Sequence, residues 1–310
     1  MKKTNPSYAL RNSWQKGQTT YEKPVMGDPL AVIYNEGFWR VNKVSPLYNL
    51  EYNDIKLKQY ASKIRQSVVS NVSTTSTKYS VQFEAQPYLK YCEEDADGLM
   101  IQVTSCSENN NNNLKVVYTA ILLSWGVKSY MDNATHLLCM LERGEQRLGT
   151  AVKAALQNTF DCTIKGFHFT QTQLLYLGFS FVENGSPRCN DPFTLCYTDP
   201  QSELREKLTL TCNAGDMLVV WNRVTDEVST SREQVKWAYQ ILKTQFFHMI
   251  GMDITKFELL DVKLPQAEIK YNGVVKMKTP ELVNCVLTIL NEISSDLVIS
   301  SDASVSSSSS

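Results

Sequence analysis

A cysteine, an aspartate and a histidine lie close together in one short segment of the chain, at Asp161, Cys162 and His168. A cysteine nucleophile needs a nearby base that lowers the pKa of its thiol, and a histidine can serve. If the chain is extended between Cys162 and His168, their even spacing places both side chains on one face. No oxyanion-holding or orienting group is recognisable around them. We therefore interpret Cys162 as a packing residue, and keep a small-molecule enzyme of unknown class using Cys162 and His168 as an alternative.

Other residues that could do chemistry are not arranged for it. The remaining histidines, His136 and His248, lie outside any HExxH pattern, and the eight cysteines include no CxxC pair, which argues against a zinc site or a thioredoxin-like centre. The acidic run from Glu93 to Asp97 lacks the glycine and the distal glutamate of an EF-hand loop. There is no Gly-rich phosphate loop and no nucleophile elbow. The sequence predicts no catalytic residue, no metal, no cofactor and no small-molecule substrate.

Charge is distributed unevenly along a chain whose net charge is only −1. Residues 1–65 carry eleven Lys or Arg and five Asp or Glu. The candidate DNA contacts in this stretch are Lys56, Lys58, Lys63 and Arg65. They lie on or near an expected helix and suit phosphate contact, but the signal is weak and a solvated helix face is the favoured explanation. A nucleic-acid-binding module that acts alone is a second alternative, which the small net charge disfavours.

The two ends of the chain differ in composition from the rest. Residues 1–34 predict a flexible arm, and the Ser-rich residues 295–310 predict a disordered tail, because neither end carries enough apolar surface to offset the entropy of ordering. No run approaches the roughly 18 apolar residues that span a bilayer. The first residues also lack the apolar core of a secretory signal. We expect an intracellular protein that does not contact a membrane.

The order of expected elements predicts an α+β fold, with mainly antiparallel sheets and flanking helices. We expect strands at residues 38–52, 78–89, 99–106, 114–125, 135–141, 193–198, 207–212, 254–264 and 268–278. We expect helices at residues 53–69, 145–160, 170–182, 215–224, 232–250 and 280–293. Successive strands without intervening helices are typical of an antiparallel meander. Two subdomains are predicted, at residues 35–185 and 190–294, divided within the turn-rich residues 184–192.

Short signals define the ends of several of these elements. Thr170 and Gln173 have the spacing of a capping box at a helix start, and Thr230 and Glu233 repeat it. The tract ENNNNN, which ends at residue 113, predicts an expanded hairpin loop. Asn272 followed by a glycine, between apolar runs, predicts a tight hairpin.

The helix expected at residues 232–250 has two apolar stripes rather than one. The larger stripe begins at Val235 and continues through the residues that follow it at helical spacing. The second stripe consists of Trp237, Ile241 and His248. A helix with two such stripes is predicted to be covered on two sides.

Three blocks in a fixed order resemble the centromere protein L family, whose members are subunits of the inner kinetochore. The first block contains Trp39, Pro46, Leu47, Tyr48 and Tyr52. The second is NTFDC, from Asn158 to Cys162, with the helix LLYLGFSF that follows. The third comprises LVVWNRV, VSTSREQV, FFHM, the hairpin from Gly273 to Lys276, and VLTILNEIS. The match covers roughly residues 35–297, and Gly178 and Phe179 stand where small residues and Met are more usual in the family.

This resemblance implies a non-enzymatic scaffold at the centromere, in the nucleus. It implies a heterodimer with a centromere protein N homologue through the C-terminal β-region. It also implies a link from the centromeric nucleosome and its DNA to centromere protein C and other inner-kinetochore subunits, in the service of chromosome segregation. The candidate partner interface is Phe257, Leu259, Val262, Ile269 and Tyr271, for which ordinary hydrophobic core is an equally good explanation.

Overall fold

A computed structural model describes residues 27–72, 77–107, 114–126, 133–201, 207–228 and 230–305, with side chains to residue 294. Most of the N-terminal arm, the Asn tract and the last five residues of the Ser-rich tail lie outside the described residues. The described chain is an α+β structure dominated by one large antiparallel sheet, which confirms the predicted fold class.

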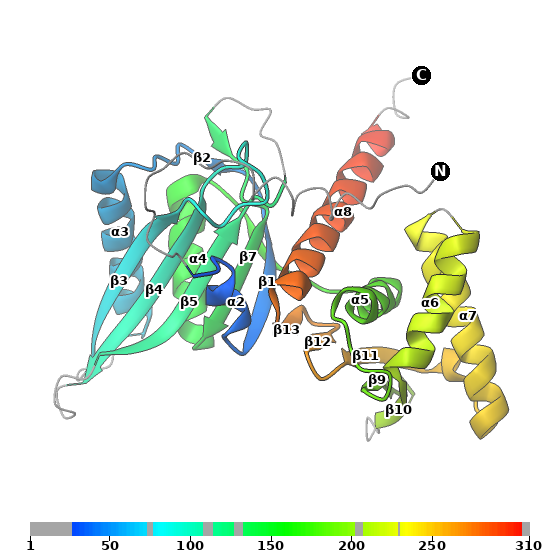
Figure 1. The fold of residues 1–310 in the computed structure, drawn as a ribbon. Helices are drawn as coiled ribbons and strands as arrows, with labels where there is room; N and C mark the ends of the chain where they lie inside the picture. The colour runs from blue at the N-terminus through cyan, green and yellow to red at the C-terminus, as the bar shows by residue number, and fades with distance from the viewer. Residues whose placement is uncertain are drawn as a thin grey trace, which may run out of the picture.

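Eleven described strands join this sheet, and its two halves follow one another in space (Figure 1). The N-terminal half ends in β3 (Thr77–Gln86) and continues through β4 (Gly98–Ser107), β5 (Lys115–Leu123), β7 (Cys139–Gly144) and β1 (Phe38–Val44). The C-terminal half continues from β1 through β13 (Val274–Met277), β12 (Ala267–Lys270), β11 (Glu258–Lys263) and β9 (Pro192–Thr198) to β10 (Lys207–Asn213). The short β8 (Ile164–Gly166) pairs with β1, and β2 (Leu47–Tyr48) pairs with β6 (Ala134–Thr135) apart from the sheet.

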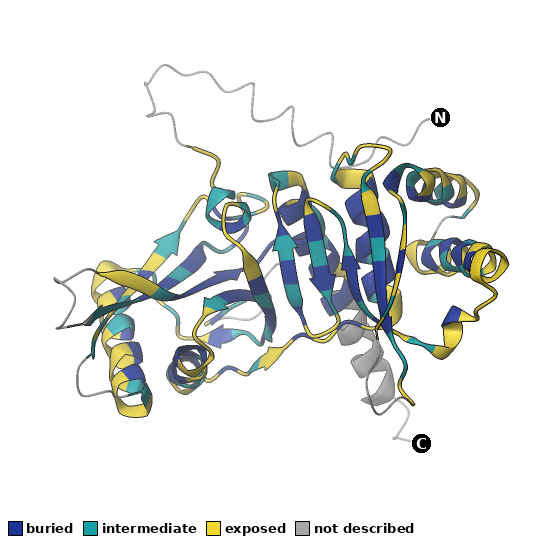
Figure 2. Ribbon diagram, turned by 90° about the horizontal axis from the view of Figure 1, so that it is seen from below, coloured by how far each residue is buried: buried dark blue, intermediate teal, exposed yellow. Residues whose placement is uncertain are grey.

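Two hydrophobic cores lie on opposite faces of this sheet. Burial alternates along the strands, as Figure 2 shows, and in β5 Ile121 faces one core while Leu122 faces the other. The first core, called the α3–α4 core, lies beneath α3 (Asp54–Val72) and α4 (Gln146–Phe160). The second, called the α5–α8 core, lies beneath α2 (Ala31–Tyr34), α5 (Gln171–Asn184), α6 (Ala214–Glu227), α7 (Ser231–Ile250) and α8 (Pro280–Val305). Among the strands that the structure describes, only β1, β5 and β7 contribute buried side chains to both cores.

The helix boundaries follow the predicted signals with two differences. Thr170 accepts a hydrogen bond from the Gln173 amide, and the Gln173 side chain accepts one from the Thr170 amide, so the capping box is confirmed. The second predicted box does not form: the Thr230 hydroxyl donates to the Glu233 carboxylate at 2.8 Å, and no side chain caps α7. In addition, α8 continues to Val305, beyond the end expected near residue 293.

Close approach of α5 to the sheet requires a glycine. A Cβ placed on Gly178 would lie 2.8 Å from Cγ1 of Val262 and 3.4 Å from the ring of Phe193. The neighbouring Phe179 stacks on Trp221 with ring centroids 4.9 Å apart and planes within 5°. Gly178 and Phe179 are the two departures from the family pattern, and they have complementary roles. The glycine lets α5 lie close to β9 and β11, and the phenylalanine packs against α6.

The strands expected near the C-terminus are confirmed in kind but shortened. The Asn272–Gly273 turn joins β12 to β13, with Gly273 at a φ of 78°. The strand expected at residues 254–264 begins with a 3-10 turn, η1 (Ile254–Lys256), before β11. The strand expected at residues 135–141 is two strands, β6 and β7. The sheet continues from β1 to β13 by backbone pairing, and the division into two subdomains stays a prediction.

Candidate interaction sites

The structure separates the residues that first suggested chemistry. Cys162 is buried in the α3–α4 core, where its thiol donates weakly to the Leu156 carbonyl at 3.8 Å. Burial raises the pKa of the Cys162 thiol to about 11. His168 is exposed and lies beyond the end of β8 at Gly166, whereas Cys162 precedes β8 and is buried. A protonated thiol in apolar surroundings is the opposite of an activated nucleophile, so this geometry gives the enzyme alternative no support.

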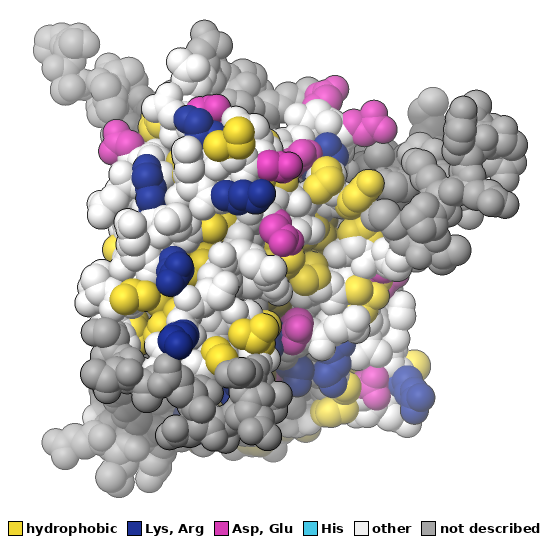
Figure 3. Space-filling view, turned by 90° about the vertical axis from the view of Figure 1, so that its left-hand side faces the viewer, with side chains coloured by type: hydrophobic (Ala, Val, Ile, Leu, Met, Phe, Trp, Pro, Cys, Tyr) yellow, Lys and Arg dark blue, Asp and Glu magenta, His cyan; other side chains and the backbone are white. Residues whose placement is uncertain are grey.

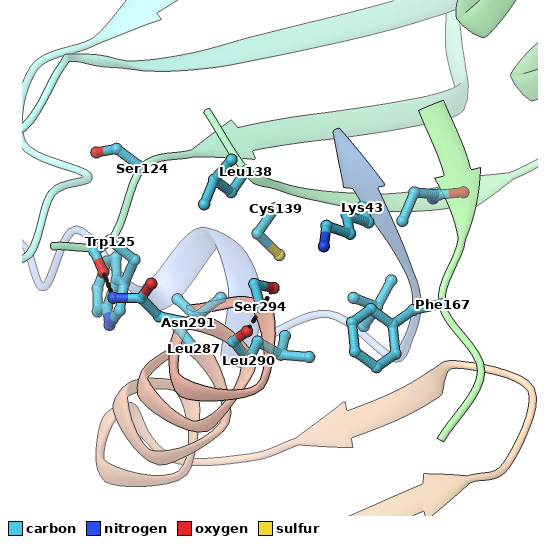
Figure 4. A pocket seen from close by; sticks show the side chains of 12 residues that line it. Lys43, Ser124, Trp125, Leu138, Cys139, Phe167, Leu287, Leu290, Asn291 and Ser294 are labelled. Atoms are coloured by element: carbon cyan, nitrogen blue, oxygen red, sulfur yellow. Dashed lines mark hydrogen bonds between the residues drawn. The ribbon is translucent and has the colours of Figure 1, made fainter. Parts of the chain in front are cut away.

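A cavity beneath α8 offers no room for a substrate (Figure 4). It is lined mainly by apolar side chains, including Phe167, Leu287 and Cys139, and has space for about one water molecule. Asn291 donates to the Trp125 carbonyl at 3.2 Å across one side of it. Burial raises the pKa of the Cys139 thiol to about 12. The cavity is a packing gap between α8 and the sheet.

Three further results concern the described residues as a whole. They contain no group of three His, Cys, Asp or Glu side chains that could hold a metal ion. Among them, no helix combines the length and apolar character needed to cross a membrane. The eight cysteines all lie within the described ranges, and no disulfide joins them there.

The five candidate interface residues divide into two groups. Leu259, Val262 and Ile269 lie in the α5–α8 core with at most 3% of their surface exposed. A register shift between Leu259 and Asp261 turns Val262 to the same side as Leu259. Phe257 is half-buried, and Tyr271 is 45% exposed. These two aromatic residues lie at the same end of the paired strands β11 and β12, where the Tyr271 amide donates to the Leu260 carbonyl.

The open edges of the sheet lie elsewhere. Both β11 and β12 have a neighbour on each side, whereas β10 and β3 are the terminal strands of the described sheet. Seven residues of β10 pair with β9, from Lys207 opposite Thr198 to Asn213 opposite Pro192. The other side of β10 presents backbone groups that another strand could pair with. The sequence predicted strands here but could not rank them, because pairing order depends on contacts between distant segments.

The candidate DNA-contacting residues lie on α3 but not in one patch. The buried stripe of α3 contains Leu57, Tyr60, Ile64 and Val68. At helical spacing, Lys56 and Lys63 lie on one side of this stripe, and Lys58 and Arg65 on the other. Lys56 also pairs with Glu51 at 2.7 Å, and this hydrogen bond and charge raise the pKa of Lys56. Figure 3 views the face of the molecule that includes α3, where Lys and Arg side chains are spread among polar and hydrophobic ones. These four residues stay candidates for DNA contact.

A buried carboxylate that sequence reasoning missed lies beneath α4. Glu142 of β7 is 2% exposed and accepts hydrogen bonds at 2.8 Å from the Tyr118 hydroxyl and from the Lys153 ammonium. Arg40 adds a salt bridge at 3.5 Å. Burial alone would raise the pKa of Glu142, but the hydrogen bonds from Lys153 and Tyr118 and the Lys153 charge hold it below its usual value. This cluster joins α4, β5, β7 and β1, so its role is to fix the centre of the sheet.

Comparison with known proteins identifies the family. A family model described as centromere protein L matches residues 33–306, which is most of the chain. The chain belongs to the centromere protein L family. A curated relative, centromere protein L of Xenopus tropicalis, is 21% identical over 285 residues, covering 86% of this chain and 80% of the relative.

Membership in the centromere protein L family indicates where the protein acts. The chain is a nuclear protein of the centromere and kinetochore that acts in chromosome segregation. The family is a structural kinetochore family and not an enzyme family. We therefore expect the function of the chain to depend on its surfaces and sheet edges rather than on its Cys, His and Asp side chains.

Proposed function

We propose that the chain is a scaffold subunit that forms a heterodimer with a centromere protein N homologue through its C-terminal β-region. The single observation that supports this proposal is the open edge of β10, a strand of seven residues that ends the C-terminal half of the described sheet. An added strand gains backbone hydrogen bonds, and side-chain pockets beside the edge supply specificity. Phe257 and Tyr271, at the ends of β11 and β12 and separated from β10 by β9, are the candidate side chains for a second contact with the same partner.

The five candidate interface residues have different parts in this proposal. Phe257 and Tyr271 contact the partner, because they have accessible surface. Leu259, Val262 and Ile269 hold β11 and β12 in place from within the core. A charge at Ile269 would unfold the sheet before it tested an interface, since Ile269 has no exposed surface.

Hydrogen–deuterium exchange tests the edge directly. In the free chain, the outward-facing amides of β10 should exchange quickly, and the centromere protein N homologue should protect them. The other terminal strand, β3, is the internal control and should be unchanged. Protection confined to β3, or protection of neither strand in a complex that forms, would contradict the edge assignment.

Co-purification tests the side chains. Phe257→Glu and Tyr271→Glu, each on a folded chain, should weaken capture of the partner at least tenfold, as expected for aromatic anchors. Trp237→Glu, which changes an exposed aromatic residue on α7, is the matched control and should retain capture. Full capture by both interface variants would remove Phe257 and Tyr271 from the proposal.

We further propose that the assembled heterodimer links the centromeric nucleosome and its DNA to centromere protein C and other inner-kinetochore subunits. DNA contact is assigned to Lys58, Lys63 and Arg65, with a smaller part for Lys56 because Glu51 already neutralises it. Replacing all four with Glu should weaken DNA binding by the complex and reduce the slope of affinity against salt concentration. An unchanged slope would refute this assignment. Tight DNA binding by the isolated chain at physiological salt would instead favour a module that acts alone.

A further inference from the structure

One helix of the α5–α8 core carries an apolar surface that the chain itself leaves uncovered. The sequence of α7 predicts burial on two sides, and only one side is buried in the structure, through Val235, Ala238, Leu242 and Phe246. The second stripe, Trp237, Ile241 and His248, is half-buried only at Ile241 and otherwise exposed; together with the adjacent exposed Phe247 it forms the surface that we call the α7 outer face. Trp237 is 58% exposed and Phe247 is 52% exposed.

The exposed apolar area on α7 is large enough for an interaction with another chain. Met249 and Ile250 at the C-terminal end of the helix are also exposed. At helical spacing they continue the buried stripe beyond Phe246, where nothing in the described chain covers them. With typical areas for these side chains, the exposed apolar surface is roughly 400 Å². Patches of that size on soluble proteins commonly mark interaction sites. The buried stripe packs α7 against α5 and α6, so the outer face is presented on a rigid element.

The charges around the α7 outer face have one prevailing sign. The helix carries Arg232, Lys236 and Lys243 against a single acidic residue, Glu233. The Glu233 carboxylate accepts the Thr230 hydroxyl at 2.8 Å. Beyond the helix, Asp253 accepts hydrogen bonds from the amide and the hydroxyl of Thr255. These two carboxylates keep their charge, but on α7 itself three basic side chains stand against one acidic side chain, so the helix is basic on balance.

We propose that the α7 outer face binds an acidic amphipathic helix of another protein. Trp237 and Phe247 are about 15 Å apart along α7, or roughly three helical turns, which suits a helix laid across this side. Large apolar side chains of the partner cover Trp237 and Phe247. Acidic side chains on its flanks meet Lys236 and Lys243.

A second copy of this chain fits the surface less well. Two α7 helices in contact would bring Lys236 and Lys243 close to like charges. The neighbouring α6 is acidic on balance, but Val219 is the only large apolar side chain exposed on this fully described helix. It cannot match a stripe of several large apolar groups. The chemistry therefore favours a different, acidic partner.

The test uses the full chain and two labelled synthetic helices that share one leucine face. One helix carries Glu at the flanking positions, and its twin carries Lys. Fluorescence anisotropy should show that the acidic helix binds at least tenfold more tightly than its twin. Replacing Lys236 and Lys243 with Glu should reverse that preference. Equal binding of the two helices would overturn the proposal.

Apolar variants provide the second arm. Trp237→Ser combined with Phe247→Ser should weaken the acidic helix at least tenfold, and Val219→Ser, an equally exposed change on α6, should not. The double variant should still co-purify with a centromere protein N homologue. Unchanged binding of the helix would overturn the proposal. So would loss of a self-associated form in sedimentation, which would assign the face to a second copy, or loss of the centromere protein N homologue, which would assign it to the heterodimer.

Discussion

The N-terminal and C-terminal halves of the sheet are covered on opposite faces. In the N-terminal half, α3 and α4 cover the face that carries Leu99, Ile101 and Val103 of β4. In the C-terminal half, α5 to α8 cover the other face, which carries Leu195 of β9 and Ile269 of β12. The helices change from one face of the sheet to the other at β5, β7 and β1, where buried side chains alternate between the two cores. One sheet therefore supports two cores with few shared strands, and each half keeps one open face.

The open surfaces of the C-terminal half differ in whether their exposed groups have partners within the chain. On its open sheet face, Lys263 pairs with Asp261 and Glu268, and Lys270 pairs with Glu268. The ammonium groups of Lys270 and Lys276 lie about 5 Å from the Phe38 ring centroid, at 5.2 and 5.1 Å. The charged groups of this face have partners within the chain, so the face can remain exposed to solvent. The β10 edge and the α7 outer face have no such internal partners among the described residues, and they are the two surfaces for which we propose another chain.

The largest effect should come from single truncations on either side of β7. Met140 faces the α3–α4 core and Leu141 faces the α5–α8 core, and both are fully buried. Met140→Ala and Leu141→Ala should each lower the free energy of unfolding by about 2–4 kcal/mol. Because the cores share β1, β5 and β7, we expect one cooperative transition in calorimetry for either variant. Two transitions, with each variant shifting only one of them, would show that the halves unfold independently and would favour the two predicted subdomains.

The buried carboxylate at the centre of the sheet should give the next largest effect. Glu142→Gln leaves Lys153 and Arg40 without their charge partner and should destabilise the fold by about 2–3 kcal/mol. The folded-state pKa of Glu142 is lowered. Its contribution is therefore complete above the unfolded value, near 4.3, and is lost as the pH falls through the folded value. Chemical unfolding of both proteins between pH 7 and pH 3 checks this, and an equal loss of stability in the variant would contradict it.

The sequence predicted elements well and their three-dimensional neighbours poorly. Leu57, Tyr60, Ile64 and Val68 recur at helical spacing in the sequence and are buried on one side of α3, because helical spacing is a local property. Which strands form the edges could not be predicted, because β1 pairs with β13 across more than two hundred residues. The interface candidates illustrate the difference: apolar character identified Val262 and Ile269, but only the pairing order reveals that both lie inside the sheet.

A smaller effect should follow from adding a methyl group where α5 lies closest to the sheet. Gly178→Ala places a methyl group 2.8 Å from Cγ1 of Val262, and the shift that this forces should cost about 1–2 kcal/mol. Gly37→Ala is the control, since a Cβ there has no neighbour within 4 Å. The change should also loosen the C-terminal half alone, so exchange of β9 and β11 amides should increase while that of β4 amides does not. Equal loss of protection in β4 would mean that the two cores are coupled more tightly than their separate faces suggest.

The smallest effect compares two helix starts within the C-terminal half. Thr170 makes both hydrogen bonds of a capping box, whereas the Thr230 hydroxyl donates to the Glu233 carboxylate and leaves the backbone of α7 uncapped by a side chain. Thr170→Ala should therefore cost about 1 kcal/mol, and Thr230→Ala only a few tenths of that. Urea unfolding with matched m-values measures the difference. If the two substitutions cost the same, the hydroxyl of Thr230 caps α7 in solution, and the start of the helix that carries the α7 outer face is held as firmly as α5.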